Sequence, residues 1–90
     1  MMFRIYMDLL IFVQVKRVVE MVREFPGLGD RIKKAREGDG RSLLQICRES
    51  GVSRTYWYQL ENEQIYASVS EEVIRKIETT LGVDLGIYFE

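Results

Sequence analysis

The sequence contains no histidine and a single cysteine, Cys47, among its 90 residues. One cysteine excludes an internal disulfide, and the absence of histidine excludes structural zinc sites of the Cys/His type. No histidine is present to activate Cys47 as a nucleophile, and the sequence has neither a Gly-rich phosphate loop nor a nucleophile elbow. We therefore expect a protein that is not an enzyme and that needs no metal, no cofactor and no evident small-molecule ligand.

The sequence also lacks an apolar run long enough to cross a membrane. Its most apolar stretch, IYMDLLIFVQV at residues 5–15, is interrupted by Asp8, whereas a bilayer core takes roughly 20 apolar residues. No small-residue cleavage site of the A-x-A type follows it, so we do not expect a signal peptide. The sequence therefore predicts a cytoplasmic protein without a membrane partner.

Positive charge is not in excess, because 13 Lys and Arg residues face 14 Asp and Glu residues, for a net charge of −1. Non-specific affinity for nucleic acid comes from Lys and Arg that neutralise phosphates, so charge alone does not predict DNA binding. Cations nevertheless outnumber acids within residues 30–41, and many of the acids lie after residue 60. The small net charge therefore conceals an uneven distribution of positive and negative residues along the chain.

The N-terminal part of the chain carries two overlapping patterns. Apolar residues alternate from Phe3 to Val15, which favours a strand. A 4-3-4-3 spacing, which favours one stripe of a helix, links Ile11, Val15, Val18, Val22 and Phe25. We predict a helix from about Leu10 to Glu24 after a short strand or irregular lead-in, ended by Pro26 and Gly27.

Four further helices are predicted after residue 27. The first covers residues 29–37. The others cover residues 42–50, 53–62 and 70–82, and each begins at a serine that can act as its N-cap, namely Ser42, Ser53 and Ser70. Glu71 and Glu72 suit the positive end of the last helix, and Gly51 follows the second. The closing residues 84–90 are compatible with one helical turn or a short strand. At this length we expect one compact unit, with residues 1–26 as an N-terminal extension for packing or dimerisation and 27–90 as the main domain.

The stretch LGDRIKKAREGDGRSLLQICRESGVSRTYWYQLENE, with the later LGVDL, resembles the helix-turn-helix domain of the phage repressor and Cro group, the XRE family. The resemblance covers about residues 28–85. It depends on R-I-K-x-x-R, the small Cys47, Gly51-Val52-Ser53, Leu60-Glu61-Asn62 and Leu81-Gly82-Val83. It implies a mainly α fold of four to five helices, here with an extra N-terminal helix and possible short terminal strands.

The resemblance also implies which residues carry the function. Residues 53–62 would form the recognition helix in the major groove of double-stranded DNA. Its base-contacting positions fall on Arg54, Thr55 and Gln59, with Tyr58 beside them. Of these, Arg54 suits guanine and Gln59 suits adenine. Phosphate-binding positions fall on Ser53 and Asn62. Arg41 stands at a position that is usually apolar, and it could either contact a phosphate or face solvent.

Other positions are expected to be structural. The resemblance implies a buried ion pair between Arg36 and Glu61, and a close helix crossing at Cys47. Gly51 occupies a position that takes a positive φ, and Trp57 points inward, so we favour a core role for Trp57 over base stacking.

The sequence departs from the family pattern in ways that leave two hypotheses open. Leu43 replaces the common glutamine, Glu63 replaces the glycine that usually follows Asn62, and Tyr56 and Tyr58 make the recognition helix more aromatic. The first hypothesis is a sequence-specific DNA-binding regulator that binds a palindromic operator as a homodimer. The second is a protein-interaction module or antitoxin of the same fold that does not bind DNA strongly. A positive stripe beside Arg54 would favour DNA, and an apolar patch around the two tyrosines would favour protein.

Overall fold

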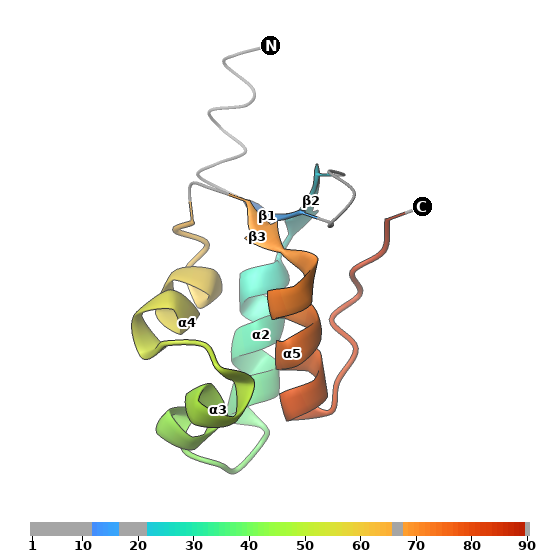
Figure 1. Ribbon diagram of the computed structural model, residues 1–90. Helices are drawn as coiled ribbons and strands as arrows, with labels where there is room; N and C mark the ends of the chain where they lie inside the picture. The colour runs from blue at the N-terminus through green and yellow to red at the C-terminus, as the bar shows by residue number, and fades with distance from the viewer. Residues whose placement is uncertain (1–11, 17–21, 66–67, 90) are drawn as a thin grey trace.

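The structure is a computed structural model that describes residues 12–16, 22–65 and 68–89 (Figure 1). Its elements, in chain order, are β1 (Phe12–Lys16), β2 (Val22–Pro26), α2 (Leu28–Glu37), α3 (Leu43–Ser50), α4 (Arg54–Glu61), β3 (Val69–Ser70) and α5 (Glu71–Leu81). The described part of the chain is therefore mainly helical, as predicted, with four helices and one small sheet.

The helix predicted from Leu10 to Glu24 is wrong. Residues 12–16 and 22–26 form two antiparallel strands, in which Val13 pairs with Phe25. β3 pairs with β1 in parallel, so the strand order is β2-β1-β3. The period-two alternation, rather than the helical stripe, therefore determines the local structure of residues 12–16. The rest of the N-terminal segment up to residue 11, together with residues 17–21, lies outside the described residues.

The burial of the two strands explains why the sheet prevails. Val13 and Val15 are fully buried and Lys16 is exposed, as expected when alternate side chains of a strand point to opposite faces. The helical stripe required Val22 to be buried, but 52% of its surface is exposed. β-branched residues suit a half-buried strand, and β3 supplies a partner for β1 that no local pattern in the first 26 residues reveals.

The four helices predicted after residue 27 are confirmed, and their serine caps are present. The hydroxyl oxygen of Ser42 accepts a hydrogen bond from the backbone N–H of Gln45 at 3.1 Å, and Ser70 caps α5 through Val73 at 3.2 Å. Such caps satisfy backbone N–H groups that the first helical turn leaves unpaired. Residues 84–89 form neither the helical turn nor the strand that the sequence allowed.

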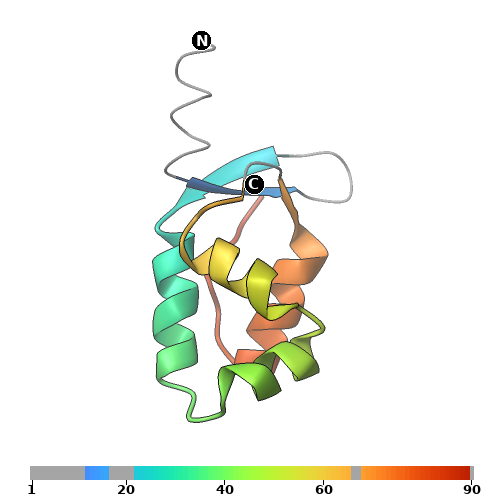
Figure 2. The same ribbon diagram turned by 90° about the vertical axis from the view of Figure 1, so that its left-hand side faces the viewer.

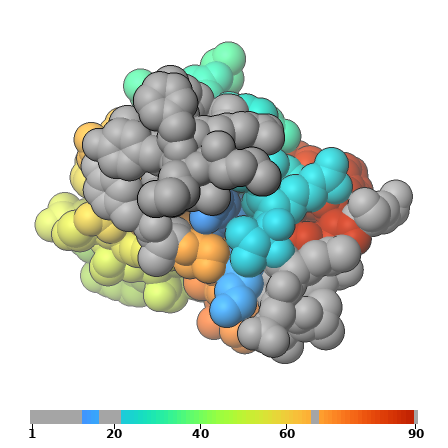
Figure 3. Space-filling model, turned by 90° about the horizontal axis from the view of Figure 1, so that it is seen from above, coloured from blue at the N-terminus to red at the C-terminus, as the bar shows by residue number. Residues whose placement is uncertain are grey.

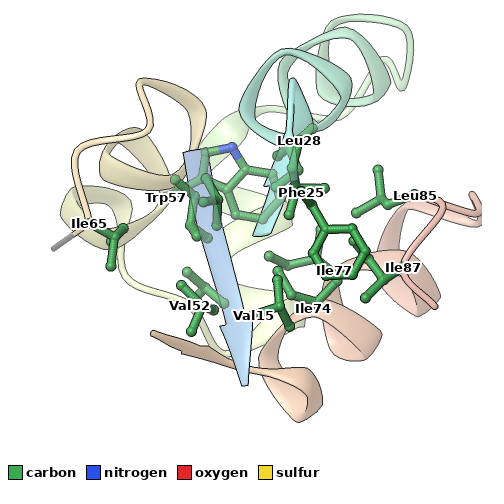
Figure 4. Close-up of a cluster of buried hydrophobic side chains, with 14 of the residues drawn as sticks. Val15, Phe25, Leu28, Val52, Trp57, Ile65, Ile74, Ile77, Leu85 and Ile87 are labelled. Atoms are coloured by element: carbon green, nitrogen blue, oxygen red, sulfur yellow. The ribbon is translucent and has the colours of Figure 1, made fainter. Parts of the chain in front are cut away.

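The sheet lies across one end of the helices (Figures 1 and 2). Buried side chains of the strands and of the helices belong to one core. Val15 and Phe25 of the strands belong to the same buried cluster as Trp57 of α4 and Ile77 of α5 (Figure 4). The fully buried large side chains are Trp57, Leu28, Ile32, Ile46, Leu60, Ile74, Ile77, Ile87, Val13, Val15 and Val69. The described N-terminal strands therefore help to complete the core of their own chain.

The closing segment, residues 83–89, packs as an extended chain beside α5 and β2. Leu85, Ile87 and Phe89 are buried, and the ring of Phe89 lies edge-on to Phe25 with centroids 5.8 Å apart. Arginine side chains of β2, α2 and α5 donate hydrogen bonds to its backbone carbonyls. Figure 3, which views the sheet end of the molecule, shows β2 next to this segment.

Candidate nucleic-acid interface

α3 and α4 are joined by a three-residue turn with a left-handed glycine at its start. Gly51 has a φ of 76°, a conformation that a side chain makes unfavourable. Its backbone N–H donates to the carbonyl of Cys47 at 2.9 Å, and the N–H of Val52 donates to the same carbonyl at 3.2 Å. Cys47 is buried, and burial raises the pKa of its thiol. Gly51 therefore has the positive φ expected of it, whereas the close helix crossing expected at Cys47 stays a prediction.

A buried carboxylate holds α4 against α2. Glu61 Oε2 accepts hydrogen bonds from Arg36 Nε and from the indole Nε1 of Trp57, each at 2.5 Å. Glu61 Oε1 accepts a third from Arg36 Nη2 at 3.0 Å. The hydrogen bond to Glu61 raises the pKa of Arg36. The expected contact between Arg36 and Glu61 is present, and Trp57 joins it from the core.

This cluster fixes the rotation of α4 and so determines which side chains point outward. With 3.6 residues per turn, the residues opposite the buried side share a face about 140° wide. We call these residues the α4 face: Arg54, Thr55, Tyr58, Gln59 and Asn62. Gln59 is partly buried and the other four are exposed. The structure thus brings together on one surface the residues for which base and phosphate contacts were predicted, apart from Ser53 and Arg41.

The first turns of α3 and α4 differ from that of α5 in charge. Neither α3 nor α4 has an acidic residue in its first turn, whereas α5 carries Glu71 and Glu72 there. Ser53, the N-cap of α4, accepts a hydrogen bond from the backbone N–H of Tyr56 at 3.1 Å. Helix N-termini favour anions, and phosphate groups bind them through free backbone N–H groups. The N-termini of α3 and α4 can therefore bind phosphate groups, whereas the positive end of the α5 dipole is already balanced by Glu71 and Glu72.

Arg41 is held by its own chain. Its guanidinium donates to Asp39 at 2.6 and 2.8 Å, to Glu49 at 2.7 Å and to the carbonyl of Thr80 at 2.5 Å. The hydrogen bond to Asp39 is the main cause that raises the pKa of Arg41. These contacts tie the loop before α3 to the end of α5. The phosphate contact considered for Arg41 stays a prediction, and two carboxylates already balance its charge.

The two tyrosines of α4 lie in different environments. Tyr58 is 49% exposed in the middle of the α4 face, whereas Tyr56 is partly buried against the core, and burial raises the pKa of its hydroxyl. The apolar patch that was considered around both tyrosines therefore includes the exposed Tyr58 but not Tyr56, which packs against the core. Leu44 of α3, which was not predicted to be part of the site, is an apolar surface residue that is 51% exposed. Its only signal in the sequence was the pair Leu43-Leu44 directly after the Ser42 cap.

Glu63 was noted only as a departure from the family pattern, but the structure gives it a specific environment. Its carboxyl accepts a hydrogen bond from the backbone N–H of Val13, and burial raises its pKa. The sequence shows a negative charge after α4 but does not show that this charge turns inward.

A comparison with protein-family models finds a match to a family described as helix-turn-helix over residues 32–88. The match starts within α2 and includes α3, the turn, α4 and α5, so it covers the whole candidate interface. It does not include β1 or β2. Searches of curated proteins and of solved structures find no match. None of the helices in the described ranges is long and apolar enough to span a membrane.

Proposed function

Because the chain belongs to the XRE type of the helix-turn-helix family, we propose that it is a sequence-specific transcriptional regulator that binds double-stranded DNA through α4. The family consists of DNA-binding regulators that are typically not enzymes. The observation that supports the proposal most is the α4 face, whose polar side chains the buried Arg36–Glu61–Trp57 cluster turns outward.

The residue types on this face suit contacts with base edges in the major groove. Arg54 is the one Lys or Arg residue of α4. Its guanidinium can donate two hydrogen bonds, to O6 and N7 of guanine. The amide of Gln59 can pair with N6 and N7 of adenine. Thr55 and Tyr58 add apolar surface that can contact a thymine methyl group. In the proposed complex, these four residues determine the sequence preference.

Phosphate contacts would set the position of α4 in the groove without selecting a sequence. Ser53 and Asn62 lie at the two ends of α4, and both are exposed. The N-termini of α3 and α4 supply backbone N–H groups for the same purpose. With a net charge of −1, the protein depends on these short-range contacts more than on bulk positive charge.

We further propose that the protein binds a palindromic operator as a homodimer. Two copies of α4 in successive major grooves would place the two Arg54 residues about 34–36 Å apart. Sedimentation of the full chain, alone and with operator DNA, tests the dimer. A complex with one protomer on a single half-site would contradict it.

Selection of bound DNA from a random pool tests the DNA-binding function. We expect enrichment of one short sequence, and Arg54→Ala should weaken binding to it by about 1–3 kcal/mol while relaxing the preference at one base pair. Gln59→Ala should relax the preference at a different base pair. Lys76→Ala is the control, because it removes an exposed cation of α5 and should leave the preference unchanged.

An absence of enrichment would favour the alternative function, a protein-interaction module or antitoxin of the same fold. The observations in its favour are the exposed Tyr58 and Leu44, since exposed apolar side chains of this size are common at protein interfaces. If Arg54→Ala and Gln59→Ala both leave affinity and sequence preference unchanged, α4 is not the recognition helix.

A further inference from the structure

Glu63, the second residue after α4, has a backbone conformation that side chains rarely adopt. Its φ is 54°, and among the described residues no other non-glycine residue has a positive φ. The Cβ atom makes this region unfavourable for residues other than glycine. A non-glycine residue persists there when its surroundings hold it in place. We therefore expect contacts of the Glu63 side chain to hold its backbone in this conformation.

The Glu63 side chain lies where three elements meet. A Cβ atom at Gly29 of α2 would be 2.7 Å from Glu63 Cγ, and 2.5 and 2.6 Å from the carbonyl oxygens of Glu61 and Leu60. The carboxyl group accepts a hydrogen bond from the backbone N–H of Val13 in β1. One side chain thus connects the C-terminal end of α4, the start of α2 and the start of β1.

One oxygen of this carboxyl group is poorly accommodated as an anion. Glu63 Oε1 is buried and has no hydrogen-bond partner in the part of the chain that the structure describes. The carbonyls of Leu60 and Glu61 belong to the last turn of α4, the negative end of the helix dipole, which disfavours a carboxylate. A neutral carboxyl group has an O–H that can donate to such a carbonyl. Protonation would therefore remove the negative charge that burial and this helix end disfavour.

The balance of nearby groups raises the pKa of Glu63 above its ordinary value. Burial has the largest effect and raises the pKa of Glu63, whereas the hydrogen bond from Val13 and the charge of Arg31 lower it. The charge of Asp30 raises it again. Both charged groups come from α2. β1 contributes a backbone amide, and α4 contributes backbone carbonyls.

We propose that Glu63 is a positioning residue that couples the C-terminal end of α4 to the β1–β2 strand pair. We call the contacts of Glu63 with Val13 and Gly29 the joint, and we propose that proton uptake by the Glu63 carboxyl tightens it. A proton from solvent binds Oε1 and neutralises the carboxylate, and the proton returns to water when the joint loosens. The link to DNA affinity rests on the proposed role of α4 in contacting DNA.

The direction of the pH effect follows from the pKa shift. Because the pKa of Glu63 is raised in the folded protein, the stabilising effect of the proton is complete below the unfolded pKa. It is lost as the pH rises through the folded pKa. The joint is therefore tight at mildly acidic pH and loose at higher pH. The chain has no histidine, the side chain that ordinarily titrates between about pH 5 and pH 8, so a transition there is simple to assign.

Nuclear magnetic resonance of the labelled full chain tests the joint without DNA. We expect the Glu63 carboxyl carbon to titrate above the ordinary glutamate range, and the backbone amide of Val13 to shift with the same midpoint. Glu63→Gln should abolish the shift of Val13, and Glu72→Gln, at an exposed site on α5, should preserve it. If Glu63 titrates in the ordinary range, or if the Val13 amide does not follow it, the joint is refuted.

Glu63→Gly keeps the inference testable if Glu63→Gln does not fold, because glycine suits the positive φ. This variant should also remove the titration of the Val13 amide. A Val13 titration that persists in a folded Glu63→Gly protein would assign the effect to another group and refute the inference.

The second experiment measures the dissociation constant for the selected DNA at mildly acidic and at slightly alkaline pH. In the native chain we expect at least about a fivefold loss of affinity as the pH rises, at the lower end of typical coupling between sites. The Glu63→Gln protein should show little change. Equal changes in both proteins would refute the coupling to α4. If no protein binds any selected DNA at either pH, the DNA-binding function fails, while the amide titration still decides the joint.

Discussion

Glu61 is the residue on which the orientation of α4 depends most directly. Its side chain is 3% exposed and accepts hydrogen bonds from a guanidinium and an indole. Removing one partner of a buried ion pair leaves the other charge uncompensated, which is more damaging than losing one neutral donor. The two donors to Glu61 are therefore expected to contribute unequally.

Arg36→Ala should lower the free energy of unfolding by about 3–5 kcal/mol, because it leaves a buried carboxylate without a counter-ion. Trp57→Phe removes only one of the hydrogen bonds to Glu61 and some volume, so a loss of about 1–3 kcal/mol is expected. Urea unfolding followed by circular dichroism measures both. A larger effect of Trp57→Phe would show that core volume, not charge pairing, holds α4 in place.

Gly29 allows α2 and α4 to approach closely, since a Cβ atom would lie 2.5 and 2.6 Å from two backbone carbonyls of α4. Gly29→Ala should therefore destabilise the protein by about 1–3 kcal/mol, the usual range for overpacking. Gly38→Ala is the matched control, because its Cβ would meet nothing closer than 3.5 Å. Equal thermal unfolding midpoints for the two variants would contradict this contact.

Arg41 is expected to act on stability, and its effect should depend on pH. Its hydrogen bonds lower the pKa of Asp39, so the pair stabilises the fold above the unfolded pKa of Asp39. This contribution disappears as the pH falls through the folded pKa. Arg41→Ala should therefore lower the unfolding midpoint at neutral pH, and the difference from the native chain should narrow in strong acid, where only the contact of Arg41 with the Thr80 carbonyl is left. A pH-independent difference would exclude this explanation.

At the scale of elements, β1 connects the N-terminal part of the chain to the helical core. It pairs with β2 on one side and with β3, which directly precedes α5, on the other. The strands place Val15 inward and Val22 outward, whereas a helix through residues 11–25 would place both on one buried stripe. Mutation of these two valines therefore distinguishes the sheet from the helix.

Val15→Ala should lower the free energy of unfolding by about 2 kcal/mol, since it removes buried methyl groups and leaves a small cavity. Val22→Ala should change it by no more than about 0.5 kcal/mol, as is usual for exposed positions. Chemical unfolding curves of the two variants provide the comparison. Similar losses at both positions would support the helical stripe instead.

At the scale of the whole molecule, positive charge is limited and partly neutralised internally. Two carboxylates bind Arg41, and Lys34 forms an exposed pair with Asp30 at 3.1 Å. DNA binding by such a protein should depend on geometry more than on charge. We expect weak binding to arbitrary DNA and a strong dependence on base contacts.

The salt dependence of operator binding measures this property. If each protomer neutralises two phosphates, a dimer should give a slope of about −3.6 in a plot of log K against log salt concentration. Arg41→Ala should leave the slope unchanged, because its carboxylate partners already balance that charge. A slope reduced by about one unit for each protomer would show that Arg41 contacts a phosphate after all.

The sequence alone determined the helices after residue 27. The caps at Ser42, Ser53 and Ser70 and the turn at Gly51 depend on the residues next to them, so local sequence is sufficient to predict them. The Arg36–Glu61 contact and the residues of the α4 face came from the resemblance to a known family, whose spacing the chain keeps.

Only the tertiary structure decided the features that depend on residues far apart in the chain. Residues 11–15 satisfied both a helical and a strand pattern, and the choice between them required the pairing of Val15 with Val69. The inward position of Tyr56 and the contact of Glu63 with Val13 likewise depend on how separate elements pack. Local periodicity reports which faces of a segment are apolar, but it does not contain the partner that covers them.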